Sequence, residues 1–362
     1  LTAVCWGVYG PVLHSGQVGM GGSRWLPFIC VGLAYFVIAV AAPLAVLQAK
    51  GEVGQWTMPG ALWSLAAGAA GAVGALGIIL ALSYRGNPIY VMPLVFGGAP
   101  VVNTFLTMFM ARSFKAAGPM FFAGLILVGA GAVTVLFFRP ALGAAPGAAA
   151  VAPLSAFEFG CVAFSVFATA LAWGVYGPVL HKGQAAMGNS KLRPLICVGV
   201  SYFVIAVLMS LLVITISPEP GAAWTVKGTF WSLAAGTAGA LGALGIIMAF
   251  NFGGKPIFVM PLVFGCAPVI NTAYTLATAR TFATSSPLFY AGLILVAVGA
   301  VTVLIFSPKP GKKPAEPAPA AGLAPAVATV AAAAPTVATG TSPAGPAVSG
   351  TLETSLRSTE GS

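Results

Sequence analysis

The stretch WGVYGPVLHSGQ at residues 6–17 returns almost unchanged as WGVYGPVLHKGQ at 173–184. Both copies are followed by further shared stretches at an offset of 167 to 168 residues, and almost everything between them is apolar. The shared stretches are WSLAAG (63–68 and 231–236), VMPLVFG (91–97 and 259–265) and AGLILV (123–128 and 291–296). A long apolar block that occurs twice predicts a membrane protein built from two internal repeats.

The composition of the chain excludes a soluble fold. Hydrophobic residues make up 59% of the chain and charged residues 6%, and the mean hydropathy is +0.98. Soluble chains average about 25% charged residues, so we expect a lipid bilayer around this one. No aspartate occurs, and metal-assisted hydrolysis needs clustered carboxylates. We therefore expect no metal, no cofactor and no enzyme.

The apolar runs, bounded by charges, prolines or glycine clusters, predict five membrane helices in each copy, because a spanning helix needs about 20 mainly apolar residues. The runs are continuous and do not alternate in polarity, which favours helices over a barrel. The expected helices lie at residues 1–14, 25–48, 60–83, 88–111, 118–138, 154–180, 194–216, 228–250, 256–279 and 287–306.

Five helices per copy is an odd number, so the second copy enters the membrane from the opposite face. The predicted fold is an all-α membrane protein with ten transmembrane helices arranged as two inverted five-helix repeats. Of the 16 lysines and arginines, eleven fall on the side of the N-terminus, which predicts cytoplasmic N- and C-termini. The net charge of +10 is therefore a topology signal, and we expect no nucleic-acid partner.

The predicted organisation is a first repeat at 1–138, a linker at 139–153, a second repeat at 154–306 and a disordered Pro/Ala-rich cytoplasmic tail at 307–362. Leu1 aligns with Ala168, which lies inside the matching helix of the second repeat. The first helix is therefore expected to lack its N-terminal half, and a cleaved signal peptide is the alternative.

The first helix of each repeat carries matching polar and aromatic residues. A proline bends a helix, and bent helices at matching positions point to a binding site. His14 and His181 are the only histidines, and a histidine can carry a proton near neutral pH. The alternative is an interfacial histidine beside an aromatic belt. The candidate substrate-binding residues here are Trp6, Tyr9, His14, Trp173, Tyr176 and His181.

The fourth helix of each repeat contains a second matching motif, PLVFGGAPVVNT at 93–104 and PLVFGCAPVINT at 261–272. An asparagine inside a membrane span should face a partner helix or a wet cavity, and an interhelical hydrogen bond worth about 1 kcal/mol is the alternative to a binding role. We expect further substrate contacts at Asn103, Thr104, Asn271 and Thr272. The expected helix bends that act as gates are Pro11, Pro93, Pro100, Pro178, Pro261 and Pro268.

Two other features have plainer interpretations. Glycines recur every third residue in the third helix of each repeat, from Gly68 and from Gly236, which predicts close helix packing. Glu158 is the only acid within an expected span, and we expect it at a helix end, near the membrane surface. Because no acid lies at mid-membrane, a neutral, zwitterionic or anionic solute is favoured over an organic cation.

The run at 81–137 and its twin at 249–305 resemble an EamA-type repeat of the drug/metabolite transporter superfamily, with a small-residue third helix, a proline-bearing fourth helix and a glycine-rich fifth helix. The resemblance implies ten helices, cytoplasmic termini and a cavity lined by helices 1, 3, 4, 6, 8 and 9. One departure concerns the end of the fourth helix, where Arg112 and Arg280 stand in place of the acid of a Leu-Gly-Glu signature. Proton coupling through that acid is therefore not implied.

The function expected from the sequence is a secondary-active transporter in a bacterial inner or plasma membrane. It would move a small polar metabolite by alternating access, and its partners would be that solute and the lipid bilayer, as a monomer or a homodimer. A passive channel, or a membrane scaffold whose tail binds partners, is the alternative. An intramembrane enzyme is disfavoured, because the chain has no Asp, no HExxH and no Ser/His/Asp set.

Overall fold

The computed structural model describes residues 1–110, 112, 117–138, 153–280 and 285–306. The predicted tail and all but the last residue of the predicted linker lie outside these residues. The described part of the chain forms helices and short connections, without a strand. Its elements are α1 (Thr2–Gly19), α2 (Trp25–Tyr35), the π-helix η1 (Phe36–Ala41), α3 (Ala42–Lys50), α4 (Met58–Ser83), α5 (Pro88–Met110), α6 (Pro119–Phe137), α7 (Ala156–Ala186), α8 (Leu192–Tyr202), the π-helix η3 (Phe203–Leu208), α9 (Met209–Ile216), α10 (Val226–Asn251), α11 (Pro256–Ala279) and α12 (Pro287–Ile305).

All ten predicted apolar runs are helical. Two of them contain a π-helical turn, so that α2–η1–α3 and α8–η3–α9 are each one continuous helical segment. Within the described residues, seven helices are long and apolar enough to cross a membrane by length and composition. Shorter apolar helices lie at Pro119–Val135 and Pro287–Val303. The described part of the protein is therefore all-α, with helices suited to a lipid bilayer.

The first helix of each repeat is longer than predicted. We expected ends at residues 14 and 180, but α1 ends at Gly19 and α7 at Ala186. Neither stretch that follows a histidine contains a proline, which would break a helix, and each contains a glutamine, which is a good helix former. The chain turns away only where Gly21, Gly188 and Asn189 adopt positive φ angles, which glycine and asparagine tolerate best.

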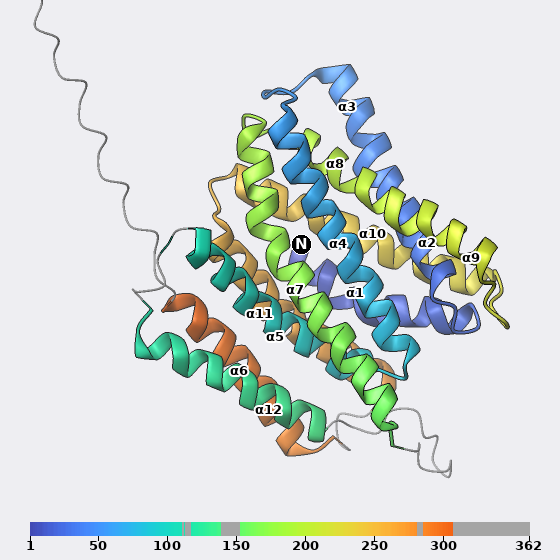
Figure 1. The fold of residues 1–362 in the computed structure, drawn as a ribbon, viewed down its shortest axis with the longest axis vertical. Helices are drawn as coiled ribbons and strands as arrows, with labels where there is room; N and C mark the ends of the chain where they lie inside the picture. The colour runs from blue at the N-terminus through green and yellow to red at the C-terminus, as the bar shows by residue number, and fades with distance from the viewer. Residues whose placement is uncertain (111, 113–116, 139–152, 281–284, 307–362) are drawn as a thin grey trace, which may run out of the picture. The chain divides into compact units, whose positions relative to one another are not determined.

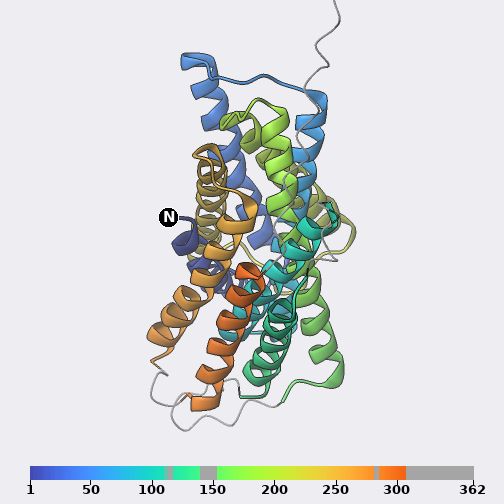
Figure 2. The same cartoon turned by 90° about the vertical axis from the view of Figure 1, so that its left-hand side faces the viewer.

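The helices of the two repeats pack on one another reciprocally. Helix α4 packs on α7, and its counterpart α10 packs on α1. Helices α6 and α12 pair with each other and lie side by side in Figures 1 and 2. A β-carbon at Gly68 would lie 2.7 Å from the Cα of Val198, and one at Gly236 would lie 2.7 Å from the Cα of Val31. The glycines therefore have the packing role expected of them.

Equivalent segments of the two repeats run in opposite directions. Arg24, just before α2, lies against Glu219, just after α9. Lys191, just before α8, accordingly lies against Glu52, just after α3. The segment α2–η1–α3 is therefore antiparallel to α8–η3–α9, and the rings of Tyr35 and Tyr202 stack where the two segments cross, with centroids 3.6 Å apart.

Candidate functional site

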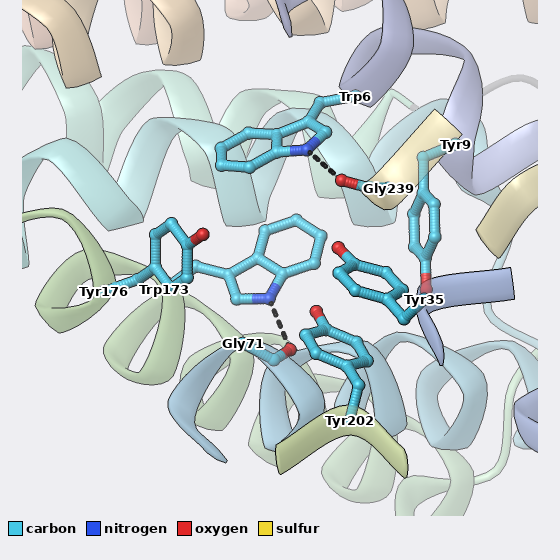
Figure 3. Close-up of a pocket in the computed structure, with 8 residues that line it drawn as sticks. All are labelled: Trp6, Tyr9, Tyr35, Gly71, Trp173, Tyr176, Tyr202 and Gly239. Atoms are coloured by element: carbon cyan, nitrogen blue, oxygen red, sulfur yellow. Dashed lines mark hydrogen bonds between the residues drawn. The ribbon is translucent and has the colours of Figure 1, made fainter. Parts of the chain in front are cut away.

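Six aromatic side chains and two glycines surround a small cavity between the two repeats (Figure 3). They come from α1, α2, α4, α7, α8 and α10. The cavity has a volume of about 20 Å³, which is room for about one water molecule. Its lining residues are Trp6, Tyr9, Tyr35, Gly71, Trp173, Tyr176, Tyr202 and Gly239. We call this set the aromatic box.

The two tryptophans of the box are fixed by matching hydrogen bonds. The indole N–H of Trp6 donates to the carbonyl oxygen of Gly239 at 3.3 Å, and that of Trp173 donates to Gly71 at 3.2 Å (Figure 3). Their ring centroids are 6.1 Å apart and the rings are inclined by 24°. Because both indole donors are already used, the tryptophans offer their faces and edges to a ligand, not their N–H groups.

Tyr9 and Tyr176 supply hydrogen-bonding groups that the protein itself does not use. Both side chains are buried, and neither hydroxyl has a hydrogen-bond partner. A buried hydroxyl without a partner is costly, so it is uncommon in a purely structural position. Since both tyrosines line the cavity, their hydroxyls are available to bond a polar group inside it.

Tyr35 and Tyr202 belong to the box but were not among the predicted site residues. They occupy matching places in YFVIAV (35–40 and 202–207), and a π-helical turn begins directly after each of them. Such turns are frequent at functional sites. The repeated tyrosine within an apolar run was the signal in the sequence that could have found them.

The histidines do not line the cavity. His14 and His181 lie farther along α1 and α7 and are half-buried. The Nδ1 atom of His14 has no hydrogen-bond partner, and the ring of His181 packs edge-on against Phe250 with centroids 5.1 Å apart. Their predicted contact with substrate stays a prediction.

The asparagines and threonines of the fourth helices also lie away from the box. Asn103 and Asn271 are both fully buried. The amide nitrogen of Asn271 donates to the carbonyl of Pro88 at 3.0 Å, whereas neither amide atom of Asn103 has a partner. The hydroxyls of Thr104 and Thr272 are likewise unpartnered.

The predicted gate prolines lie inside continuous helices. Pro11 is within α1, Pro178 within α7, and Pro93 and Pro100 within α5. Positions 261 and 268 fall within the bounds of α11, and the side chain at 261 lies outside the described part. Pro93, Pro268 and Thr272 line a separate apolar pocket of about 300 Å³ between α5, α11 and α12.

The helices that line the cavity differ in part from those implied by the family resemblance. Among the described side chains, the fourth helices α5 and α11 contribute no lining residue. Their Phe96 and Phe264 instead pack against Trp173 and Trp6, with centroids 5.8 and 5.9 Å apart. The lining instead includes Tyr35 from α2 and Tyr202 from α8, the second helical segment of each repeat.

Charged side chains are absent from the described lining of the box. Glu158 lies at the start of α7, where it forms a capping box with Ser155 and meets Arg85 at 3.4 Å. That is the helix-end position expected of it. Within the described residues, no three histidine, cysteine or acidic side chains gather closely enough to hold a metal ion.

Comparison with known proteins names no relative. No protein-family model and no curated protein matches the chain. Eighteen solved chains do match. One of them, described as "Crystal structure of protein", is 21% identical to this chain and has a TM-score of 0.49. The matched region covers 84% of this chain and 97% of the solved chain. A likeness of this degree carries no inference about function.

Proposed function

We propose that the protein is a secondary-active transporter that moves a small polar metabolite across a membrane by alternating access. The observation that carries the proposal is the aromatic box, which both repeats build with the same residues from helices that run in opposite directions. Transporters of this kind place their site where two inverted repeats meet. In this proposal the ten helical segments form two inverted five-helix repeats of the EamA type.

The membrane orientation follows from charge. Lys50, Lys191 and Arg193 share one end of the structure with Glu52, where α3 and α7 end. This is the lysine- and arginine-rich end, so we assign it to the cytoplasm of a bacterial inner membrane. The end that holds Arg24 and Glu219 then faces outward.

The chemistry of the box favours some solutes over others. An isolated ion without a partner is expensive to bury, and the described lining holds no charged group. Aromatic faces attract cations, whereas the hydroxyls of Tyr9 and Tyr176 can donate to a carboxylate or carbonyl. A neutral solute, or a zwitterion that brings its own counter-charge, therefore fits better than a lone organic cation.

The mechanism we propose is a rocking of the two repeats around the box. A cavity of about 20 Å³ is too small for a metabolite, so the helices must part to admit one. If they part at only one end at a time, the solute is exposed to each side in turn, as in other inverted-repeat carriers. A structure closed around its centre fits a carrier better than an open pore.

Counterflow in proteoliposomes tests the proposal. Vesicles are loaded with pooled unlabelled solutes of one class (sugars, amino acids, organic anions or organic cations), and uptake of the matching labelled pool is followed. Saturable exchange in one pool is the expected result. Uptake that does not saturate would favour the channel, and no exchange by folded protein would favour the scaffold.

A matched set of variants ties the transport to the box. We expect Trp6→Ala and Trp173→Ala to abolish counterflow to a similar degree. The controls are Trp56→Ala and Trp224→Ala, which change a second matching tryptophan pair that is about half exposed, in connections outside the box. Loss of transport in the controls, or normal transport in the box variants, would contradict the assigned site.

A further inference from the structure

Two glutamates tie the two repeats together at opposite ends of the structure. Glu52, in the connection after α3, reaches the turn before α8, and Glu219, in the connection after α9, reaches the turn before α2. We call these contacts the Glu52 latch (Glu52 with Ser190, Lys191, Leu192 and Arg193) and the Glu219 latch (Glu219 with Ser23 and Arg24). Each latch joins one repeat to the other.

The Glu52 latch has many short contacts. The hydroxyl of Ser190 donates to Oε2 at 2.6 Å, and the backbone N–H of Lys191 donates to Oε1 at 2.5 Å. The guanidinium of Arg193 lies 3.4 Å from Oε2, and the two side chains of this ion pair are only 11% and 12% exposed. A carboxylate at a helix start, paired with a buried arginine, is held by charge-assisted hydrogen bonds.

The Glu219 latch repeats this arrangement, but its arginine lies farther away and is more exposed. The hydroxyl of Ser23 donates to Oε2 at 2.6 Å, and the backbone N–H of Arg24 donates to the carboxylate at 3.1 Å. The Arg24 side chain is 3.9 Å from the carboxylate and 42% exposed, and its guanidinium lies over the ring of Tyr84. An exposed ion pair at this distance contributes little.

A threonine beside each latch makes the same contact at both ends. The hydroxyl of Thr57 donates to the carbonyl of Ala186 at 3.0 Å, and the matching Thr225 donates to Gly19 at 2.7 Å. The two latches therefore share this contact and differ in the arginine that faces the glutamate. The Glu219 end also holds the pair of Arg85 with Glu158, but its side chains are 42% and 24% exposed, and exposed pairs contribute little. The difference in the facing arginine makes the Glu219 latch the easier one to open.

We propose that Glu52 and Glu219 are the opposing gate residues of the carrier, and that the Glu219 end opens more readily in the resting protein. The inference rests on the proposed function, because a carrier that exposes one site to two sides must break its inter-repeat contacts at one end at a time. Both latches are closed in the structure described here. To open one end, the protein must break the contacts of the glutamate at that end, Glu52 at one and Glu219 at the other.

Two native cysteines can report on the two ends separately. Cys30 in α2 is 1% exposed and packs with Met20 and Ala222, next to the Glu219 latch. Cys197 occupies the matching place in α8 and is 5% exposed. Proteins that keep only one of these thiols are treated in detergent with a water-soluble thiol reagent, and the labelling rate is measured against that of unfolded protein.

We expect Cys30 to react faster than Cys197 in the otherwise unchanged protein. Glu219→Gln should speed the labelling of Cys30 by about fivefold or more and leave Cys197 unchanged or slower. Glu52→Gln should do the reverse. Arg193→Gln should speed the labelling of Cys197 more than Arg24→Gln speeds the labelling of Cys30. The reason is that Arg193 pairs closely with Glu52, whereas Arg24 lies farther from Glu219.

Each variant serves as the control for the other. If either substitution sped both thiols equally, the glutamate would act through general stability, and the gate assignment would be wrong. Equal rates for Cys30 and Cys197 at the start would overturn the claim that the Glu219 end opens first. If each glutamate variant sped the labelling of its own thiol alone but the protein showed no counterflow, the gate residues would be supported and the carrier function would be contradicted. The two proposals can therefore be tested separately.

Discussion

The centre of this protein is the same in both repeats, whereas its ends differ. At the centre, the two indole N–H groups donate to glycine carbonyls at 3.3 and 3.2 Å, and Tyr35 and Tyr202 stack across the boundary. At the ends, one glutamate faces a buried arginine at 3.4 Å and the other faces an exposed arginine at 3.9 Å.

The difference separates two tasks of the proposed carrier. A site that must be presented to both sides in turn is best served by equal surroundings from both repeats. A preference for one side needs unequal contacts, and these are found at the ends. Sequence change is therefore expected to alter the direction of the bias more easily than the chemistry of the site.

The largest effect should come from filling the helix contacts beside the centre. Gly68→Ala and Gly236→Ala place a β-carbon against the backbone of the facing helix, so we expect each to lower the free energy of unfolding by about 1–3 kcal/mol. Thermal or denaturant unfolding in detergent measures this. Gly129→Ala and Gly160→Ala are the controls, because nothing lies within 4 Å of their added carbons. If the two variants lost different amounts of unfolding free energy, the centre would not be equivalent in the two repeats.

A smaller effect, on transport alone, is expected from the tyrosine hydroxyls. Tyr9→Phe and Tyr176→Phe remove groups that bond to nothing in the closed protein, so stability should not fall. If the hydroxyls contact the solute, each loss should raise the half-saturating concentration in counterflow by roughly 3- to 10-fold. A stability loss without a transport change would assign the hydroxyls to the fold instead.

The smallest effect tests an unequal pair. Asn271→Leu removes a hydrogen bond to the carbonyl of Pro88, whereas Asn103→Leu removes only unpartnered atoms. We expect the Asn271 variant to be less stable than the Asn103 variant by about 1 kcal/mol. Unfolding midpoints of the two single variants measure the difference. Normal counterflow by the double variant would remove both asparagines from the substrate site.

The aromatic residues show which parts of the candidate site could be predicted from the sequence. Trp6, Tyr9, Trp173 and Tyr176 were chosen because they repeat beside a proline, and all four line the cavity. Tyr35 and Tyr202 also line the cavity and were not predicted, whereas the predicted contact of the histidines with substrate stays a prediction. A helix that is apolar on every side has no polar face to reveal which side points inward, so depth and direction could not be read from the pattern.

The sequence by itself determined that the protein is helical, that it belongs in a membrane and that its two halves are copies. These properties follow from composition and repetition, because a span needs only enough apolar residues to satisfy the bilayer. The tertiary structure alone decided which residues meet at the centre and which glutamate faces a buried arginine. Those outcomes depend on contacts between residues more than 100 positions apart, where packing geometry, not local pattern, selects the partner.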